Sequence, residues 1–147
     1  MPAEERRPVT VALTVLAYIV VSFGVQGTSH FAINSEHYAA IPIMRAEPVI
    51  AMGIASMVIQ GLLFAWLFPI FNRRGSPLRN GIVFSWALGA FLASYIVLGE
   101  AGKYAIPSIP SWIGVEASAA FAQYTFFGAV LGWLHRRELA LPAGQMA

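Results

Sequence analysis

The sequence contains a long run without ionisable side chains at residues 49–71, which reads VIAMGIASMVIQGLLFAWLFPIF. An α-helix rises 1.5 Å per residue, and the hydrocarbon layer of a bilayer is about 30 Å thick, so roughly 20 apolar residues cross it. The run has this length. It therefore predicts a transmembrane helix and places the protein in the membrane class.

Three further apolar blocks lie on either side of this run. Together the blocks predict four helices, at about residues 9–30, 49–71, 82–100 and 112–135. Hydrophobic residues make up 58% of the 147 residues and charged residues 11%, a composition outside that of ordinary globular proteins. We therefore expect a single membrane domain over residues 1–147, an all-α antiparallel bundle of four transmembrane helices.

The positions of the cations predict the orientation of this bundle. Of the nine Lys and Arg residues, only Arg45 and Lys103 lie in connections on one side; the others are Arg6, Arg7, Arg73, Arg74, Arg79, Arg136 and Arg137. Short connections rich in Lys and Arg stay in the cytoplasm, so we expect both termini there. Because the basic balance follows from this topology, it predicts no nucleic-acid partner.

Small residues predict where the helices touch, because helices in lipid associate through close packing and buried polar groups. Gly128 and Gly132 form a G-x-x-x-G pattern in the fourth helix, and Gly89 lies with Ser85 and Ala93 on one face of the third. These glycines contact either a neighbouring helix of the same chain, which is the commoner arrangement, or a second chain.

Part of this pattern also resembles a known group of proteins. A His closes the first helix, GIVFSWALG opens the third at residues 81–89, and the glycine pair precedes His135, Arg136 and Arg137. This layout resembles small uncharacterised bacterial four-helix inner-membrane proteins and covers most of the chain. The resemblance implies residence in the bacterial inner membrane and carries no activity.

Polar residues gather at the helix ends that would share the outer membrane face. Antiparallel neighbours bring together the end of the first helix, the start of the second, the end of the third and the start of the fourth. The residues expected to converge there are His30, Glu36, His37, Glu47, Glu100, Glu116 and Gln123. A carboxylate such as Glu116, one turn inside the membrane, needs a partner or a raised pKa.

Several functions suit such a cluster. It could hold a metal ion on His30, Glu100 and Glu116, relay protons, or bind a cationic ligand. Alternatively, these are interfacial side chains in water, and Glu116 pairs with Lys103 or Arg45. The sequence has no H-x-x-x-H or E-x-x-H ligand pair on one helix face, which weighs against the metal site; the sequence does not identify a metal.

The first helix carries a polar residue at every fourth position: Thr10, Thr14, Tyr18, Ser22, Gln26, His30 and Asn34. Thr and Ser hydroxyls can bond to the carbonyl four residues earlier, which accounts for Thr10, Thr14 and Ser22. Gln26 and His30 are less easily explained in this way, because they need partners if they lie within the bundle.

Known catalytic patterns are missing from the sequence. It has no Cys, no Asp, and no glycine loop of the Walker or Rossmann type. We therefore expect a non-catalytic protein that requires no cofactor: an accessory, assembly or scaffold subunit of a larger inner-membrane complex, in contact with lipid and with other subunits or copies of itself. The alternative is a membrane protein that binds a small solute, a proton or a metal through a periplasmic-side His/Glu cluster.

Overall fold

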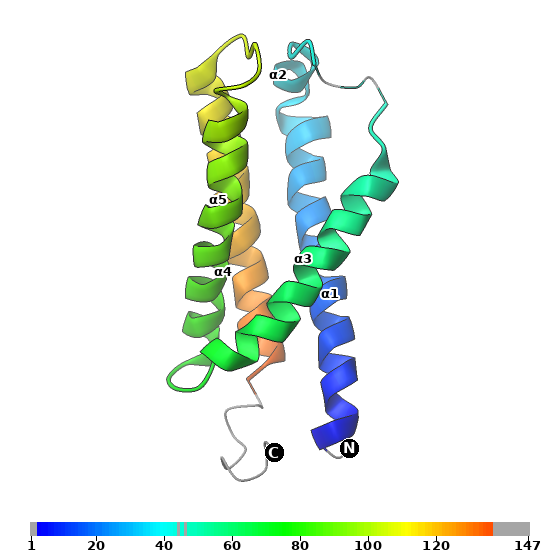
Figure 1. The fold of residues 1–147 in the computed structure, drawn as a ribbon, viewed down its shortest axis with the longest axis vertical. Coiled ribbons are helices and arrows are strands. Elements are labelled where there is room, and N and C mark those ends of the chain that lie inside the picture. The colour runs from blue at the N-terminus through cyan, green and yellow to red at the C-terminus, as the bar shows by residue number, and fades with distance from the viewer. Residues whose placement is uncertain (1–2, 44, 46, 137–147) are drawn as a thin grey trace.

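A computed structural model describes residues 3–43, 45 and 47–136, and it places helices, turns and loops, but no strand, in these residues. In chain order the elements are α1 (Ala3–Thr28), the π-helical turn η1 (Ser29–Ile33), α2 (Ser35–Ala39), α3 (Ile50–Phe71), α4 (Pro77–Ser94), the π-helical turn η2 (Tyr95–Glu100) and α5 (Ile109–Leu134). Figure 1 shows α1, α4 and α5 standing side by side, with α3 crossing α1 at an angle.

Three of the described helices are long and apolar enough to cross a membrane, at Arg7–Ile33, Ile50–Phe71 and Pro77–Glu100. The sequence predicts four such helices, and α5 is not among those three. Its length of 26 residues is sufficient, but Glu116 and Gln123 lower its hydropathy. Both of these side chains are buried inside the bundle, so α5 combines an apolar exterior with a polar inner face.

The helix ends differ from the predicted ones at two places. α1 begins at Ala3, so Pro8 lies inside the helix although the sequence places it at the helix start. Proline has no N–H, so one backbone hydrogen bond is missing in the second turn of α1. α4 begins at Pro77, where the fixed φ of proline suits the first helical position and its missing N–H has no partner to lose.

α4 and α5 pack with their backbones in contact. A Cβ atom added to Gly81 would lie 2.2 Å from the carbonyl oxygen of Gly128, and one added to Gly132 would lie 2.3 Å from the carbonyl oxygen of Pro77. At Gly89 the added atom would overlap the ring of Tyr124. The glycines of the G-x-x-x-G pattern therefore contact a helix of the same chain. We call this contact the glycine seam.

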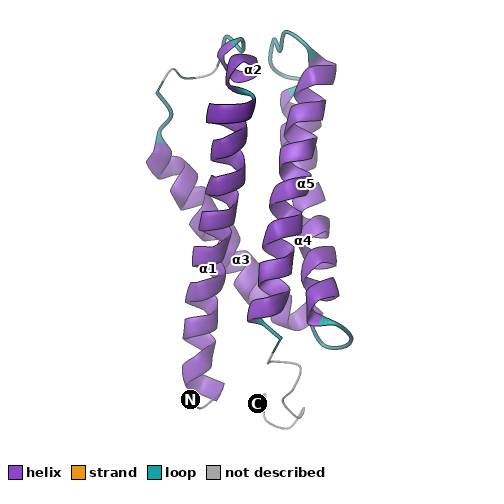
Figure 2. Cartoon of the chain, turned by 180° about the vertical axis from the view of Figure 1, so that it is seen from behind, coloured by secondary structure: helices purple, strands orange, loops and turns teal. Residues whose placement is uncertain are grey.

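α3 approaches α1 closely at Gly61. A Cβ atom on Gly61 would lie 3.0 Å from the Cα of Val15. Away from this crossing the two helices separate, and Figures 1 and 2 both show the first half of α3 leaning out from the bundle. Residues 50–56 of α3 are exposed as a consequence.

A cluster of aromatic rings fills the middle of the bundle. Phe64 packs edge-on against Phe127 with ring centroids 4.8 Å apart, and Tyr18 packs edge-on against Phe127 at the same distance. Phe68 and Leu131 are fully buried beside them. We call the group of Phe64, Phe68, Phe127 and Leu131 the aromatic floor.

The two ends of the bundle differ in charge. α1 begins, α3 joins α4, and α5 ends at the same end of the bundle (Figure 1). This end, which we call the basic end, carries the exposed residues Arg7, Arg73, Arg74, Arg79 and Arg136. The opposite end holds η1, α2, η2, the described residues 40–43, 45 and 47–49, and the connection 101–108.

Candidate functional site

A cavity of about 350 Å³ lies between the helices, on the side of the aromatic floor away from the basic end. Residues of α1, η1, α3, α4, η2 and α5 all line it. Its polar lining residues are Tyr18, Ser22, Gln26, His30, Ser56, Gln60, Glu100, Trp112, Glu116, Gln123 and Tyr124. The polar residues of four separate segments therefore converge on one space.

Two π-helical turns contribute ionisable side chains to this cavity. η1 carries His30, and η2 ends at Glu100. A π turn holds an extra residue per turn and so changes the direction of the side chains that follow it; such turns are frequent at functional sites. α1 and η1 end at Asn34, which has φ −116° and ψ 25°, and the Asn34 amide donates to Ser29 Oγ at 3.0 Å.

Gln123 of α5 is the centre of the hydrogen-bond network that lines the cavity. Its Nε2 donates to Ser22 Oγ at 2.9 Å and lies 3.3 Å from the Tyr18 hydroxyl. Its Oε1 accepts from Gln26 Nε2 at 2.8 Å. One buried amide thus links three polar residues of α1 to α5. These residues lie four positions apart in the sequence, so they lie on the same side of α1 and can all reach Gln123.

Tyr18 extends this network to α3. Its hydroxyl donates to Gln60 Oε1, and it lies 3.3 Å from the hydroxyl of Tyr124. Gln60 Nε2 in turn donates to Ser56 Oγ at 2.9 Å. The phenol therefore joins all three helices at the bottom of the cavity, just above the aromatic floor.

α2 covers the cavity from the opposite end of the bundle. The Tyr38 hydroxyl donates to Glu116 Oε1 at 2.6 Å, and its ring stacks on His30 with centroids 3.7 Å apart. Burial raises the pKa of the Tyr38 phenol above its ordinary value, and the hydrogen bond to Glu116 raises it further. Tyr38 therefore stays protonated and holds Glu116 from above.

The cavity lining presents hydrogen-bond acceptors and negative charge. Glu100 and Glu116 lie close enough to repel each other electrostatically. The Nδ1 of His30 is 2.9 Å from the carbonyl oxygen of Gln26, and a carbonyl only accepts, so Nδ1 carries a proton and donates it there. Among the described residues, no Lys or Arg lines the cavity.

The aromatic floor closes the cavity on the side of the basic end. Phe64, Phe68 and Phe127 are at most 1% exposed, and Phe64 packs against the lining residues Tyr18 and Tyr124. Beyond the floor the next polar contact is between Thr14 Oγ1 and His135 Nε2, 3.1 Å apart. The geometry is that of a pocket with a closed bottom.

The residues predicted from the sequence to form one cluster divide into two groups. His30, Glu100, Glu116 and Gln123 line the cavity. Glu36, His37 and Glu47 do not: Glu36 and Glu47 are exposed, and His37 lies 3.3 Å from Ser111 Oγ outside the cavity. Two features of the fold explain the division. The first helix ends at Asn34, so α2 lies above the bundle, and α3, which follows Glu47, leans outward.

The expected pairing of Glu116 with Lys103 or Arg45 is not formed. Glu116 accepts its hydrogen bond from Tyr38, and Lys103 Nζ donates instead to the Tyr95 hydroxyl at 2.7 Å. That hydrogen bond raises the pKa of Lys103. Among the described residues, no three His or acidic side chains are grouped so that they could hold a metal ion, so the geometry does not support the metal hypothesis for His30, Glu100 and Glu116.

Several lining residues were not predicted as site residues: Tyr18, Ser22, Ser56, Gln60, Trp112 and Tyr124. The signal for some of them was present. Glu116, Ala120 and Gln123 repeat at helical spacing on one face of α5, and Gly53, Ser56 and Gln60 do so on α3. Polar residues that recur on one face of an apolar helix indicate that this face packs against polar side chains of a neighbouring helix.

Comparison of the chain with protein-family models, with curated proteins and with solved structures finds no match. The function therefore has to be argued from the cavity itself.

Proposed function

We propose that this protein binds a small cationic solute, of the ammonium or guanidinium class, in an intramembrane cavity. The observation that carries this proposal is the cavity lined by Glu100, Glu116 and His30, with no Lys or Arg among its described lining residues. A solute with a positive charge and N–H donors complements this lining. A solute with a negative charge would be repelled.

The size and the aromatic lining of the cavity support the same class of solute. Ligand sites span roughly 300–1,000 Å³, so a cavity of about 350 Å³ suits a small amine. Trp112, Tyr18 and Tyr124 are among the lining residues, and aromatic rings attract cations. The aromatic floor favours binding over conduction, because it closes one side of the cavity.

The proposal includes a membrane topology. All four long helices cross the membrane, with α5 as the fourth, and both termini lie in the cytoplasm of a bacterial inner membrane. Two observations support it: the polar side chains of α5 are buried, and the arginines gather at the basic end, as the positive-inside rule requires. The cavity then lies on the periplasmic side.

The test is a thermal-shift series on the protein purified in detergent. Methylammonium and guanidinium are compared with methanol and acetate. We expect the two cations to raise the Tm and the neutral and anionic probes to leave it unchanged. A ligand at a hundredfold excess over its Kd stabilises the folded state by about 2.7 kcal/mol, which is readily measured.

Matched variants locate the site. Glu100→Gln and Glu116→Gln should abolish the shift, and Glu116→Gln keeps an acceptor for Tyr38. Glu36→Gln and Glu47→Gln remove the same charge from the same end of the bundle but outside the cavity, so they should leave the shift intact. An equal loss in both pairs, or equal shifts with acetate, would refute the proposal.

The hypothesis of an accessory or scaffold subunit stays a prediction. Native mass spectrometry of gently extracted protein separates the two functions. A monomer or homo-oligomer that carries a stoichiometric amine supports solute binding. A complex of fixed composition without any bound solute supports the subunit hypothesis and opposes ours.

A further inference from the structure

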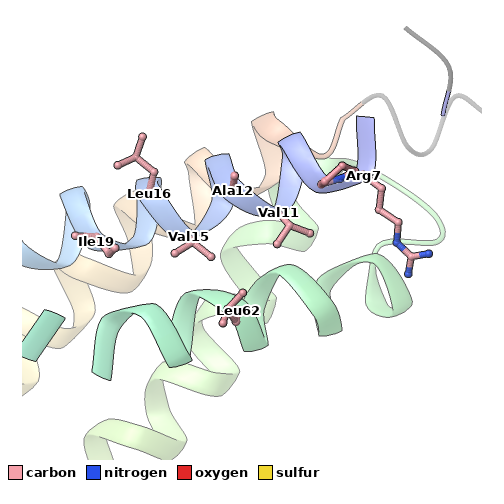
Figure 3. A pocket seen from close by; sticks show the side chains of 8 residues that line it. Arg7, Val11, Ala12, Val15, Leu16, Ile19 and Leu62 are labelled. Carbon is pink, nitrogen blue, oxygen red and sulfur yellow. The ribbon is translucent and has the colours of Figure 1, made fainter. Parts of the chain in front are cut away.

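A second hollow, of about 760 Å³, runs along α1 from the basic end past the α1–α3 crossing. Figure 3 shows it between α1 and α3, with Arg7 at one end and Ile19 at the other. Its lining is otherwise apolar and comes from one face of α1 together with Leu62 of α3. We call it the apolar groove.

The groove exists because of how the two helices cross. They approach closely at Gly61 and Val15 and then separate toward the basic end. The groove side chains that point toward α3, such as Val11 and Val15, are short, so they do not fill the widening space (Figure 3), and Leu62 of α3 stays 47% exposed. An exposed apolar groove of this kind, on a helix apolar enough to cross a membrane, faces lipid.

The length of the groove matches one leaflet of a bilayer. Its lining runs along α1 from Arg7 to Ile19, a distance of about 18 Å at 1.5 Å per residue. Half of a hydrocarbon core of about 30 Å is about 15 Å. An acyl chain lying in the groove would therefore bring its headgroup to the level of Arg7.

Arg7 supplies a charge that suits an anionic headgroup. Its side chain is exposed, and Figure 3 shows it at the open end of the groove on the side where α3 lies. Two other arginines of the basic end are already engaged: Arg73 donates to the carbonyl of Ile70 and Arg136 to that of Trp133. Guanidinium groups bind phosphate through paired N–H donors.

We infer that the apolar groove binds an anionic phospholipid, with an acyl chain along α1 and the phosphate on Arg7. This site is separate from the polar cavity, and it depends only on the protein lying in a membrane. A single Arg near an anionic lipid surface corresponds to about a fivefold preference for the anionic lipid.

The test is native mass spectrometry of delipidated protein titrated with phosphatidylglycerol or with phosphatidylcholine of the same acyl chains. We expect phosphatidylglycerol to bind about fivefold more tightly. Arg7→Gln should bring the two lipids to equal affinity, whereas Arg136→Gln, with the same charge change at the same end, should keep the preference. Equal effects of the two variants would overturn the inference.

A second pair of variants tests the groove itself. Ala12→Phe adds a ring in the groove and should weaken both lipids, whereas Leu13→Phe, on a neighbouring exposed position outside the lining, should weaken neither. Circular dichroism melting curves show that each variant is folded. If inorganic phosphate displaces phosphatidylglycerol, the site recognises a soluble anion and the inference is wrong.

Discussion

The glycine seam and the polar cavity show two opposite ways of joining helices in this bundle. Along the seam, α4 and α5 touch through their backbones, because Gly81, Gly128 and Gly132 have no side chains to separate them. Around the cavity, α1, α3 and α5 stay apart and are joined by hydrogen bonds between long side chains such as Gln123 and Tyr18. The seam is therefore a close contact without free space, whereas the hydrogen-bonded contact around the cavity leaves room for a ligand.

Both kinds of contact hold helices together in lipid. Lipid is as apolar as a Leu side chain, so hydrophobicity does not drive helices together, and close contact or polar bonding has to do so. The seam uses close contact and tolerates no added atom. The cavity uses polar bonding, which fixes the spacing of the helices without filling the space between them.

The largest effect is expected from breaking the seam with one added carbon. Gly81→Ala places a Cβ where it would meet the backbone of Gly128, so α4 and α5 have to separate. We expect a loss of more than about 3 kcal/mol in the free energy of unfolding, at the upper limit for overpacking. Thermal unfolding in detergent measures it.

A matched control uses the same substitution where space is open. Gly24 has no heavy atom within 4 Å of an added Cβ. Gly24→Ala should leave stability unchanged or raise it by up to about 1 kcal/mol through helix propensity. If the two Gly→Ala variants melt alike, the backbone contact of the seam does not exist in solution.

A medium effect is expected from removing the centre of the cavity network. Gln123→Leu leaves Ser22 and Gln26 without their shared partner, and we expect a loss of roughly 1–3 kcal/mol, the cost of unsatisfied buried polar groups. Ser118→Ala, an exposed residue of the same helix bonded only to the Val115 carbonyl, should change little. Equal stabilities of the two variants would show that the network does not hold the helices.

The smallest effect is expected at the cover of the cavity, and it depends on pH. Tyr38→Phe removes the hydrogen bond to Glu116 and should cost about 1 kcal/mol at neutral pH. Because the folded pKa of Tyr38 lies above the unfolded value of about 10, its contribution is full below pH 10 and is lost as the pH rises through the folded pKa.

The stability difference between wild type and Tyr38→Phe should therefore stay constant up to about pH 10 and shrink at higher pH. Unfolding curves at several pH values measure it, and Tyr104→Phe, an exposed tyrosine at the same end of the bundle, is the control. A difference that shrinks well below pH 10 would show that the Tyr38 phenol is not buried against Glu116.

Much of the fold could be predicted, because the length and the polarity of each helix follow from the sequence of that segment alone. Residues 49–71 predict α3 almost to the residue. The steps of four along α1 predicted less, because Thr14 and Ser22 were explained by bonds within their own helix, whereas both are buried in the bundle beside Tyr18. Ser22 shows where this reasoning stopped: its hydroxyl could have bonded to its own helix, and only the position of Gln123 gives it a partner. α5 was predicted as a fourth apolar span, whereas its polar inner face keeps it out of the three spans identified by length and composition.

The sequence by itself determined the helices, their apolar exteriors and the placement of seven of the nine Lys and Arg residues on one side, since these depend on local spacing and composition. Only the tertiary structure decided that α3 crosses α1 at Gly61, that Tyr38 folds back onto Glu116 and His30, and that Glu36, His37 and Glu47 stay outside the cavity. The physical reason is that these facts depend on crossing angles and on the turn at Asn34. Both are set by contacts between segments far apart in the chain, which the periodicity of any single helix does not contain.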